Sequence, residues 1–429
     1  MKINFIEELR WRGMLHDMIP GLEEQLNKEM TVAYIGFDPT APSLHIGNLA
    51  AIMLLKHFQL AGHKPIALVG GATGMIGDPS GKSAEREFLS EQILRENQIG
   101  IQKQLEKFLE FGVHKNSAEL VNNYDWFKEF SFLGFLREAG KFLTVNYMMS
   151  KDSVKTRLET GISFTEFSYQ LLQGYDFYHL YKTKNVRLQM GGSDQWGNIT
   201  TGTEIIRRKE GREEDSERSA FALTTPLVTK SDGSKFGKSE SGNVWLDAEK
   251  TTPYQFYQFW LNAADADAPR LIRVFTLFSK SEIESLELAH AEAPHLRLLQ
   301  KALAEEVTSR VHGKETTQLV IEASSLLFSK DAVELLENAS EELVAQLPIY
   351  RVSEENLAQC MNLTDLLSVG CDYLVCSSKG EARKAIQGNA ISINKVKVLD
   401  PQAAIPSEKI RGKYVLVGNG KQKNFIFEI

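Results

Sequence analysis

Cysteine is scarce in this chain of 429 residues, which has only Cys360, Cys371 and Cys376. Their number is odd, they show no Cys-x-x-Cys spacing, and no histidine lies near them in the sequence. The pattern therefore indicates neither a disulfide framework nor a zinc site. We expect three reduced, partly buried thiols.

Long apolar runs are also missing. No stretch approaches the roughly 18 apolar residues of a membrane-spanning helix, and we find no internal repeat or low-complexity tract. The first residues include Glu7, Glu8 and Asp17 among apolar positions, unlike a signal or transit peptide. The hydrophobic content of 42% is enough for substantial cores. We expect a cytoplasmic protein of about two to four domains with no membrane partner.

The charge is unevenly distributed. A net charge of −7 argues against a protein that coats nucleic acid indiscriminately. From residue 351 onward, however, there are 11 Lys and Arg against 8 Asp and Glu, a net +3, so the preceding part carries −10. Only the tail is basic.

Strand-like runs at 32–37, 65–69 and 185–190 alternate with helical periodicity. This alternation is typical of an α/β fold with a parallel sheet. Residues 84–182 are helical and rich in Phe, Leu and Tyr. We interpret them as an insertion that would suit a dimer surface.

We expect four parts in the chain. They are an α/β domain over 1–247, an α-helical domain over 248–330, an acidic linker over 331–355, and a small α+β domain over 356–429. The strands of the last domain are expected at 390–393, 396–399 and 414–417.

The motif His45-Ile46-Gly47-Asn48 follows a strand-like run and a proline-containing turn, and a helical pattern begins at Ile46. A strand that leads into a helix N-terminus is a phosphate site. His45 and Asn48 are three residues apart, so their donors share the helix face where the dipole favours anions. Gly47 leaves room for a base close to the backbone. Alone, His45 fits a polar helix cap equally well.

A second motif carries two cations, Lys235 and Lys238, in the glycine- and serine-rich segment 231–239. Such a segment suits a mobile loop that delivers charge to a transition state. When a carboxylate attacks the α-phosphate of ATP, negative charge collects on phosphate oxygens, so donors and cations are needed rather than a nucleophilic side chain. Alone, the lysines fit a solvated loop; the two motifs together favour nucleotide chemistry.

The pair of motifs resembles the nucleotide signatures of class I aminoacyl-tRNA synthetases. Longer strings resemble bacterial tyrosyl-tRNA synthetases across the whole chain, namely Tyr34-Ile35-Gly36-Phe37-Asp38-Pro39-Thr40, residues 71–78, Val145-Asn146-Tyr147-Met148, residues 166–177 and Gly191-Gly192-Ser193-Asp194-Gln195-Trp196-Gly197-Asn198. The resemblance implies a Rossmann-like catalytic domain, a helical domain on the anticodon side and an S4-like RNA-binding domain. It also implies a homodimer that makes tyrosyl-adenylate from L-tyrosine and ATP and then charges tRNA(Tyr).

By the same resemblance, Tyr34 and Asp176 recognise the phenol hydroxyl. Tyr169 and Gln173 share a helix face with Asp176 and are implied to hold the substrate ammonium. The remaining members of the implied tyrosine site are Asp38, Thr73, Asp78 and Gln195. Without the resemblance, this face would be the polar side of an amphipathic helix.

The implied ATP site also follows from the resemblance. Thr40, His45, Lys235 and Lys238 engage the pyrophosphate, and Asp194 binds the ribose. Asn48 stands where many relatives have histidine, and its amide donates toward the ribose. The other implied ATP contacts are Gly36, Gly47, Gly192 and Ser239. Mg²⁺ would arrive with ATP as a substrate, and we expect neither a metal site in the protein nor a tightly bound cofactor.

Residues 377–394 resemble an S4-type RNA-binding fold. The basic residues implied to contact phosphate are Lys379, Arg383, Lys384, Lys395 and Lys397, with Arg207 and Arg208 as a second surface near the tRNA acceptor end. A solvated helix face is the simpler interpretation of each residue alone. Two rival functions stay open, a tryptophanyl-type synthetase and a non-catalytic RNA-binding relative. The phenol pair Tyr34 and Asp176 argues against the first, and the intact nucleotide motifs argue against the second.

Overall fold

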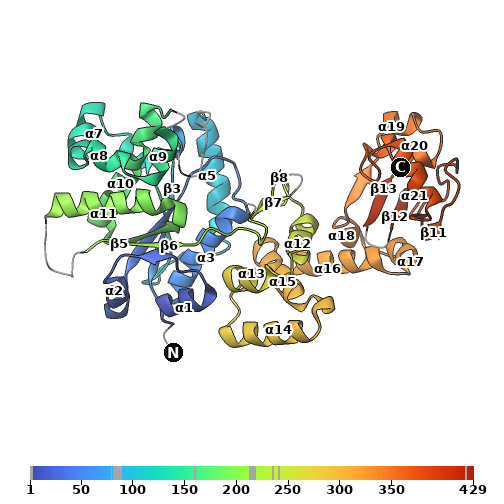
Figure 1. The fold of residues 1–429 in the computed structure, drawn as a ribbon, viewed down its shortest axis with the longest axis horizontal. Coiled ribbons are helices and arrows are strands. Elements are labelled where there is room, and N and C mark those ends of the chain that lie inside the picture. The colour runs from blue at the N-terminus through green and yellow to red at the C-terminus, as the bar shows by residue number, and fades with distance from the viewer. Residues whose placement is uncertain are drawn as a thin grey trace. The chain divides into compact units, whose positions relative to one another are not determined.

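The computed structural model describes residues 3–78, 80, 89–158, 161–211, 219–233, 236–239, 242–420 and 423–429, without the side chains of residues 153, 156, 158, 238 and 239. The chain divides into two compact units (Figure 1). Unit 1 comprises residues 1–250 and 262–303, and unit 2 comprises residues 251–261 and 304–429. Among the described residues, no helix is long and apolar enough to cross a membrane.

Unit 1 is built around a six-stranded sheet in the order β1-β6-β5-β2-β3-β4. All neighbouring strands are parallel except β1 and β6. The strands are β1 (Asp17–Met18), β2 (Val32–Phe37), β3 (Lys64–Val69), β4 (Glu119–Asn122), β5 (Val186–Gly192) and β6 (Phe221–Thr225). The four central strands β2, β3, β5 and β6 are buried along most of their length, as a parallel sheet covered by helices requires. The predicted α/β fold is confirmed.

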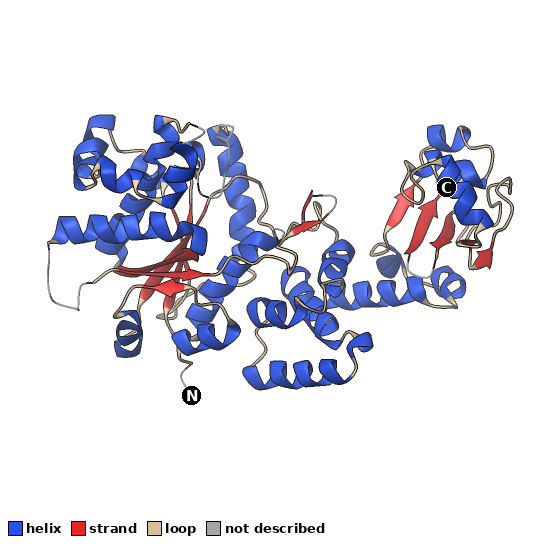
Figure 2. Ribbon diagram, in the orientation of Figure 1, coloured by secondary structure: helices blue, strands red, loops and turns tan. Residues whose placement is uncertain are grey.

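Helices pack on both faces of this sheet (Figure 2). The side chains of Tyr34, Leu68 and Phe177 belong to a core between the sheet and α10. The helices of unit 1 are α1 (Phe5–Arg12), α2 (Leu22–Lys28), α3 (Ile46–Leu60), α4 (Thr73–Ile76), α5 (Glu91–Leu105), α6 (Tyr124–Phe127), α7 (Phe132–Glu138), η1 (Gly140–Phe142), α8 (Val145–Met149), α9 (Asp152–Leu158), α10 (Phe164–Lys184), η2 (Ser193–Gln195), α11 (Trp196–Glu210), α13 (Ala268–Phe275), α14 (Lys280–Glu292) and η4 (Pro294–Leu296). A short hairpin is formed by β7 (Lys238–Ser239) and β8 (Gly242–Asn243).

The segment 84–182 is more than the helical insertion that the sequence predicts. It contains β4, which pairs with β3 and forms one edge of the main sheet. It also contains most of α10, which packs against β5. A half-buried strand of four residues is too short to give a clear alternating pattern, and this explains the difference.

Unit 2 combines helices with a second sheet in the order β11-β10-β12-β13-β9. Its strands are β9 (Ile349–Arg351), β10 (Ile391–Ile393), β11 (Val396–Lys397), β12 (Tyr414–Asn419) and β13 (Lys423–Glu428). Its helices are α12 (Pro253–Leu261), α16 (Lys314–Phe328), α17 (Ala332–Glu337), α18 (Glu341–Val344), α19 (Glu354–Ala358), α20 (Leu363–Leu366), η5 (Val369–Cys371) and α21 (Lys379–Gln387), while α15 (Leu298–His312) contributes residues to both units.

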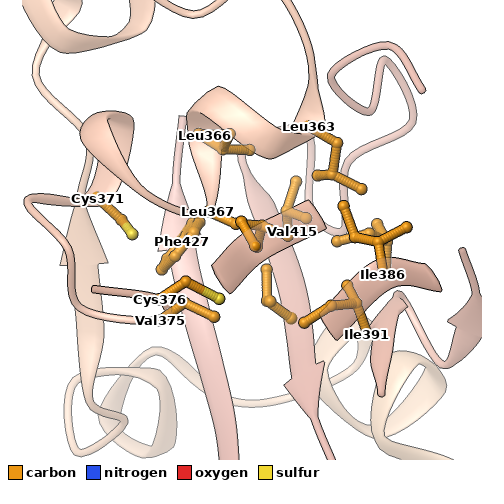
Figure 3. Close-up of a cluster of buried hydrophobic side chains, with 13 residues drawn as sticks. Leu363, Leu366, Leu367, Cys371, Val375, Cys376, Ile386, Ile391, Val415 and Phe427 are labelled. Carbon is orange, nitrogen blue, oxygen red and sulfur yellow. The ribbon is translucent and has the colours of Figure 1, made fainter. Parts of the chain in front are cut away.

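The core of the second sheet includes two of the three cysteines. Cys371 and Cys376 are buried with Leu367, Val415 and Phe427 in one apolar cluster (Figure 3). All three cysteines are free thiols.

Two expected boundaries differ in the structure. Residues 331–355, expected to be a linker, form α17, α18 and β9, and β9 pairs in parallel with β13. The expected helical domain 248–330 is divided, because residues 262–303 belong to unit 1. Sequence periodicity identifies helices, but it does not show which core each helix joins.

Candidate active site

Several of the predicted tyrosine and ATP residues lie on the central strands or directly after their carboxyl ends. β2 lies between β3 and β5, where the strand order switches, and ligands of open α/β sheets bind beyond such a point. Tyr34 and Gly36 lie on β2, Asp38 follows it, and Asp194 follows β5. Gly36 is exposed although the rest of β2 is buried. Among the described residues, a Cβ added to Gly36 would meet only the Leu68 side chain, at 3.8 Å, so the space beside it is open.

A buried pair of polar side chains forms the deep end of this site. Tyr34 and Asp176 are 1% and 2% exposed. Within the described part of the chain, the Tyr34 hydroxyl has no hydrogen-bond partner. The Asp176 carboxylate accepts from Asn123 Nδ2 at 3.0 Å and from Trp126 Nε1 at 2.9 Å. Burial raises the pKa of Tyr34 well above 10.0, and the charge of Asp176 raises it further. The hydroxyl is therefore a neutral group placed near a carboxylate.

Burial also raises the pKa of Asp176 well above 3.8. The N–H donors of Asn123 and Trp126 oppose this rise, and the charge of Asp38 adds to it. Sequence reasoning missed both donors, because they follow β4 inside the presumed insertion. Polar residues directly after an apolar strand could have indicated Asn123. Its amide is held in place, since Asn123 Oδ1 accepts from the Ala72 backbone N–H at 2.7 Å.

An acidic network continues from this pair toward the rim. Thr73 Oγ1 donates to Asp38 Oδ1 at 2.7 Å, and the Tyr169 hydroxyl donates to Asp38 Oδ2 at 2.9 Å. Burial raises the pKa of Tyr169 well above 10.0, and the charges of Asp38, Asp78 and Asp176 raise it further. Three carboxylates thus act on one phenol, and a region of negative potential suits an ammonium group.

Amides complete the same wall. Gln195 Nε2 donates to Asp78 Oδ2 at 2.7 Å, and Gln173 Nε2 donates to Gln195 Oε1 at 3.5 Å. Asn198, which was not predicted, donates to Gln195 Oε1 at 3.2 Å. The structure therefore brings together the predicted residues of α10, of the turn after β5, and of the segment after α4.

Asp194 lies in η2 directly after β5, where the residue is exposed to solvent although its carboxylate is partly surrounded by neighbouring groups. Burial raises its pKa, and the charge of Asp78 adds to this effect. A Cβ at Gly192 would lie 2.7 Å from Asp194 Oδ1, so glycine leaves room for the carboxylate. The carboxylate can therefore accept hydrogen bonds from ribose hydroxyls, and the glycine backbone lets the nucleotide come close.

The first motif starts α3 as predicted, with His45 as the N-cap. His45 Nδ1 accepts from the Gly47 backbone N–H at 3.0 Å, and Asn48 Oδ1 accepts from the His45 backbone N–H at 3.1 Å. A neutral imidazole that accepts at Nδ1 carries its proton on Nε2, so Nε2 is a donor at the positive end of a 15-residue helix. A Cβ at Gly47 would lie 2.7 Å from His45 Cε1, so this capping geometry needs glycine. Thr40 is exposed close by in the sequence.

Part of the second motif lies outside the described residues. Lys235 is outside entirely, and only the backbone of Lys238 and Ser239 is described, within β7. Gly237 is described, and a Cβ added to it would lie 3.1 Å from the Gly47 backbone nitrogen. The two motifs, 190 residues apart, therefore touch through two glycines.

The chain is similar to known proteins along nearly its whole length. The family model described as tRNA synthetases class I (W and Y) matches residues 26–329, and that of the tyrosine–tRNA ligase SYY-like C-terminal domain matches residues 340–427. A tyrosine–tRNA ligase of Cytophaga hutchinsonii is 60% identical over 427 residues, 99% of each chain. The chain belongs to the tyrosine–tRNA ligase family. A relative from Porphyromonas gingivalis with the same name is 56% identical over 434 residues, 99% of each chain.

Solved structures agree with this family assignment. A C-terminally truncated mitochondrial tyrosyl-tRNA synthetase of Aspergillus nidulans has a TM-score of 0.67 and 30% identity, covering 75% of this chain and 94% of its own. A tryptophanyl-tRNA synthetase of Plasmodium falciparum, at 13% identity and a TM-score of 0.53, shares the fold alone; the match covers 79% of this chain and 87% of that one. The resemblance to tyrosyl-tRNA synthetases is confirmed.

The basic residues predicted to contact RNA lie on α21, at β11 and on α11. Lys379, Arg383 and Lys384 lie on α21, where Arg383 and Lys384 are exposed. Lys379 pairs with the Asp365 carboxylate at 2.6 Å, and this hydrogen bond lowers the pKa of Asp365. Arg383 and Lys384 are thus exposed on one helix, and the charge of Arg383 also lowers the pKa of Asp365.

The other basic candidates have partners within the chain. The amino groups of Lys395 and Lys397 donate to backbone carbonyls at 3.2 Å and 2.8 Å. Burial lowers the pKa of Lys395. Arg207 and Arg208 both form ion pairs with Glu204. These contacts occupy hydrogen-bond donors of the four side chains and compensate part of their charge, so a phosphate would have to compete with them.

Proposed function

We infer that the protein is a tyrosine–tRNA ligase that activates L-tyrosine with ATP and then transfers the tyrosyl group to the 3′ end of tRNA(Tyr). One observation carries the inference beyond the family name: the Tyr34 hydroxyl is buried without a partner among the described residues, and the Asp176 carboxylate acts on it. A substrate phenol would satisfy both groups. Phenylalanine would leave them unsatisfied, and tyrosyl-tRNA synthetases themselves supply the measured example, a rejection of about 10⁵-fold.

The proposed binding mode places the amino acid along the acidic network. The phenol hydroxyl binds Tyr34 and Asp176, and the ammonium lies near Tyr169, Gln173 and Asp78. The carboxylate then points toward Gln195 and the open space at the strand ends. The contacts described above support this mode, because the acidic and amide groups line one continuous wall.

For the activation step, we propose that the substrate carboxylate attacks the α-phosphate of ATP and that pyrophosphate leaves. Thr40, His45 and the lysines Lys235 and Lys238 stabilise the leaving group, and Mg²⁺ enters bound to ATP. Asp194 accepts from the ribose. The remaining proposed ATP contacts are Gly36, Gly47, Asn48, Gly192 and Ser239. Donors that are already in place before the reaction do not have to reorient as charge develops on the phosphate. This preorganisation is the protein's main contribution to the step.

Tyrosine-dependent ATP–pyrophosphate exchange tests the activation step. Exchange should occur with tyrosine and not with phenylalanine or tryptophan. Asp176→Ala should reduce exchange by orders of magnitude, because the phenol loses its acceptor and Asn123 and Trp126 lose theirs. Exchange with tryptophan alone would overturn the assignment of tyrosine, and absence of exchange from a folded protein that binds tRNA would favour a non-catalytic role.

We also propose a homodimer formed through helices α7, α8 and α10 of unit 1. Side chains of α7, α8 and α10 share one apolar cluster that includes Phe135, Met148 and Leu171. The same helices expose large apolar side chains by 62–70%, namely Phe132, Leu133, Val145 and Phe164. Such a surface is unusual for a monomer. Light scattering that gives a monomer at working concentration would overturn this proposal.

For the RNA, we propose that the tail contacts tRNA phosphates mainly through Arg383 and Lys384. Smaller contributions come from Lys379, Lys395, Lys397, Arg207 and Arg208. Since tRNA charging serves translation, the proposed location is the cytoplasm. Filter binding of tRNA at several salt concentrations tests the assignment, because each lost phosphate contact lowers the salt dependence.

A further inference from the structure

The hairpin of the second motif is tied to the first motif by the main chain. The Ile46 N–H donates to the Val244 carbonyl at 2.9 Å, and the Leu246 N–H donates to the Leu44 carbonyl at 2.9 Å. His45 and Trp245 face each other in this antiparallel bridge. The segment that follows the lysine hairpin is thus joined to the first motif by backbone hydrogen bonds.

A further backbone hydrogen bond joins the two ends of the hairpin. The Val244 N–H donates to the Gly237 carbonyl at 3.0 Å, directly before Lys238. Gly237 has φ 89° and lies against Gly47, so a side chain there would be strained and crowded. Residues 244–246 therefore connect the lysine hairpin to the start of α3.

Trp245 adds a side-chain contact to this connection. Its ring meets the His45 ring edge to face, with centroids 5.8 Å apart and planes at 69°. The Lys250 ammonium lies 5.6 Å from the Trp245 centroid. The Gly47 N–H fixes one edge of the imidazole, and Trp245 restricts its rotation from another side.

We propose that Trp245 is a positioning residue for ATP activation. Its ring holds the His45 imidazole so that Nε2 points at the leaving pyrophosphate, while the backbone of residues 244–246 holds Gly237 beside the start of α3. The proposal rests on the proposed tyrosine activation, since it assigns a role within that step. A donor displaced by about 1 Å costs roughly a hundredfold in rate, so loss of the ring should be visible.

The test compares Trp245→Ala and Trp245→Phe with Trp11→Ala as a matched control. Trp11 is half-buried like Trp245 but lies on α1. The measurements are pyrophosphate exchange at varied ATP, tyrosine affinity, and the fraction of active sites from a single-turnover burst of tyrosyl-adenylate. For Trp245→Ala we expect kcat per active site to fall about ten- to hundredfold with tyrosine affinity unchanged. Trp245→Phe should recover most of the loss because an aromatic face remains, and Trp11→Ala should match the wild type.

Each other outcome counts against the proposal. Unchanged kcat and unchanged ATP KM in Trp245→Ala would overturn it. A loss seen only in the fraction of active sites, or shared with Trp11→Ala, would mean that the ring serves stability alone. A parallel loss of tyrosine affinity would mean general damage to the site. Failure of the proposed function is distinguishable, because the wild type itself would then show no exchange with tyrosine.

Discussion

Replacing Tyr34 with phenylalanine should stabilise the free protein and weaken its binding of tyrosine. The Tyr34 hydroxyl is buried without a partner in the described part of the chain, and leaving such a group unsatisfied costs about 1–3 kcal/mol. Removing it should return this energy to the free state. In the complex, the variant loses one hydrogen bond of about 0.5–1.5 kcal/mol. Because the free variant is also stabilised by about 1–3 kcal/mol, the thermodynamic cycle weakens tyrosine binding by about 1.5–4.5 kcal/mol, roughly 10- to 2000-fold.

Tyr169→Phe is the matched control. Its hydroxyl is also buried, but it donates to Asp38 at 2.9 Å, so its removal should destabilise the free protein. Thermal unfolding followed by circular dichroism, with and without tyrosine, measures both signs. We expect the midpoint of Tyr34→Phe to rise by about 1–2 °C per kcal/mol in the absence of tyrosine, because the shift becomes smaller as the unfolding unit becomes larger. A midpoint that falls as it does for Tyr169→Phe would refute the reasoning, because it would mean that the Tyr34 hydroxyl is already satisfied in the free protein.

The remaining predictions concern charge. Burial raises the folded-state pKa of Asp176 above 3.8, so the folded protein keeps this proton to a higher pH than the unfolded chain does. The free energy of unfolding should therefore fall as pH rises from 3.8 toward the raised pKa. In urea unfolding, Asp176→Asn should show a weaker dependence of this free energy on pH. Glu166→Gln should cost about 3–5 kcal/mol of unfolding free energy in chemical denaturation, because it leaves Arg157 buried without its carboxylate partner at 2.7 Å; a loss below 1 kcal/mol would contradict this. Arg383→Ala should lower the slope of tRNA affinity against salt by about 1, whereas Lys379→Ala should change it less because Lys379 already pairs with a carboxylate; equal slopes for the two variants would contradict this.

Much of the fold can be predicted because local patterns identify its long elements. The apolar run at 32–37 is β2 residue for residue, and the helix expected from Ile46 begins there. Short edge strands were missed. β4 has four residues and β9 has three, too few for an alternating pattern to stand out, and their partner strands are distant in the sequence.

For the site, the sequence indicated residues within recognisable strings but not the contacts between distant segments. The family strings indicated the Tyr34 and Asp176 pair, whose roles stay proposals, and the structure places both residues in one buried region. The same strings gave no indication of Asn123, because its contact with Asp176 joins residues 53 positions apart. Trp245 was also missed, since its contact with His45 exists only once the hairpin has paired with residues 44–46.

The distribution of cysteine has a practical consequence for labelling. All three thiols of the sequence lie in unit 2, and Cys371 and Cys376 are buried in its core, so Cys360 is the accessible target for a thiol reagent. Burial raises the pKa of Cys360, so little thiolate is present at neutral pH and the reaction should be slow until the pH is raised. A maleimide dye would then report on unit 2 alone, with unit 1 unmodified, and energy transfer to labelled tRNA could test the proposed contact of the tail separately from chemistry at the active site.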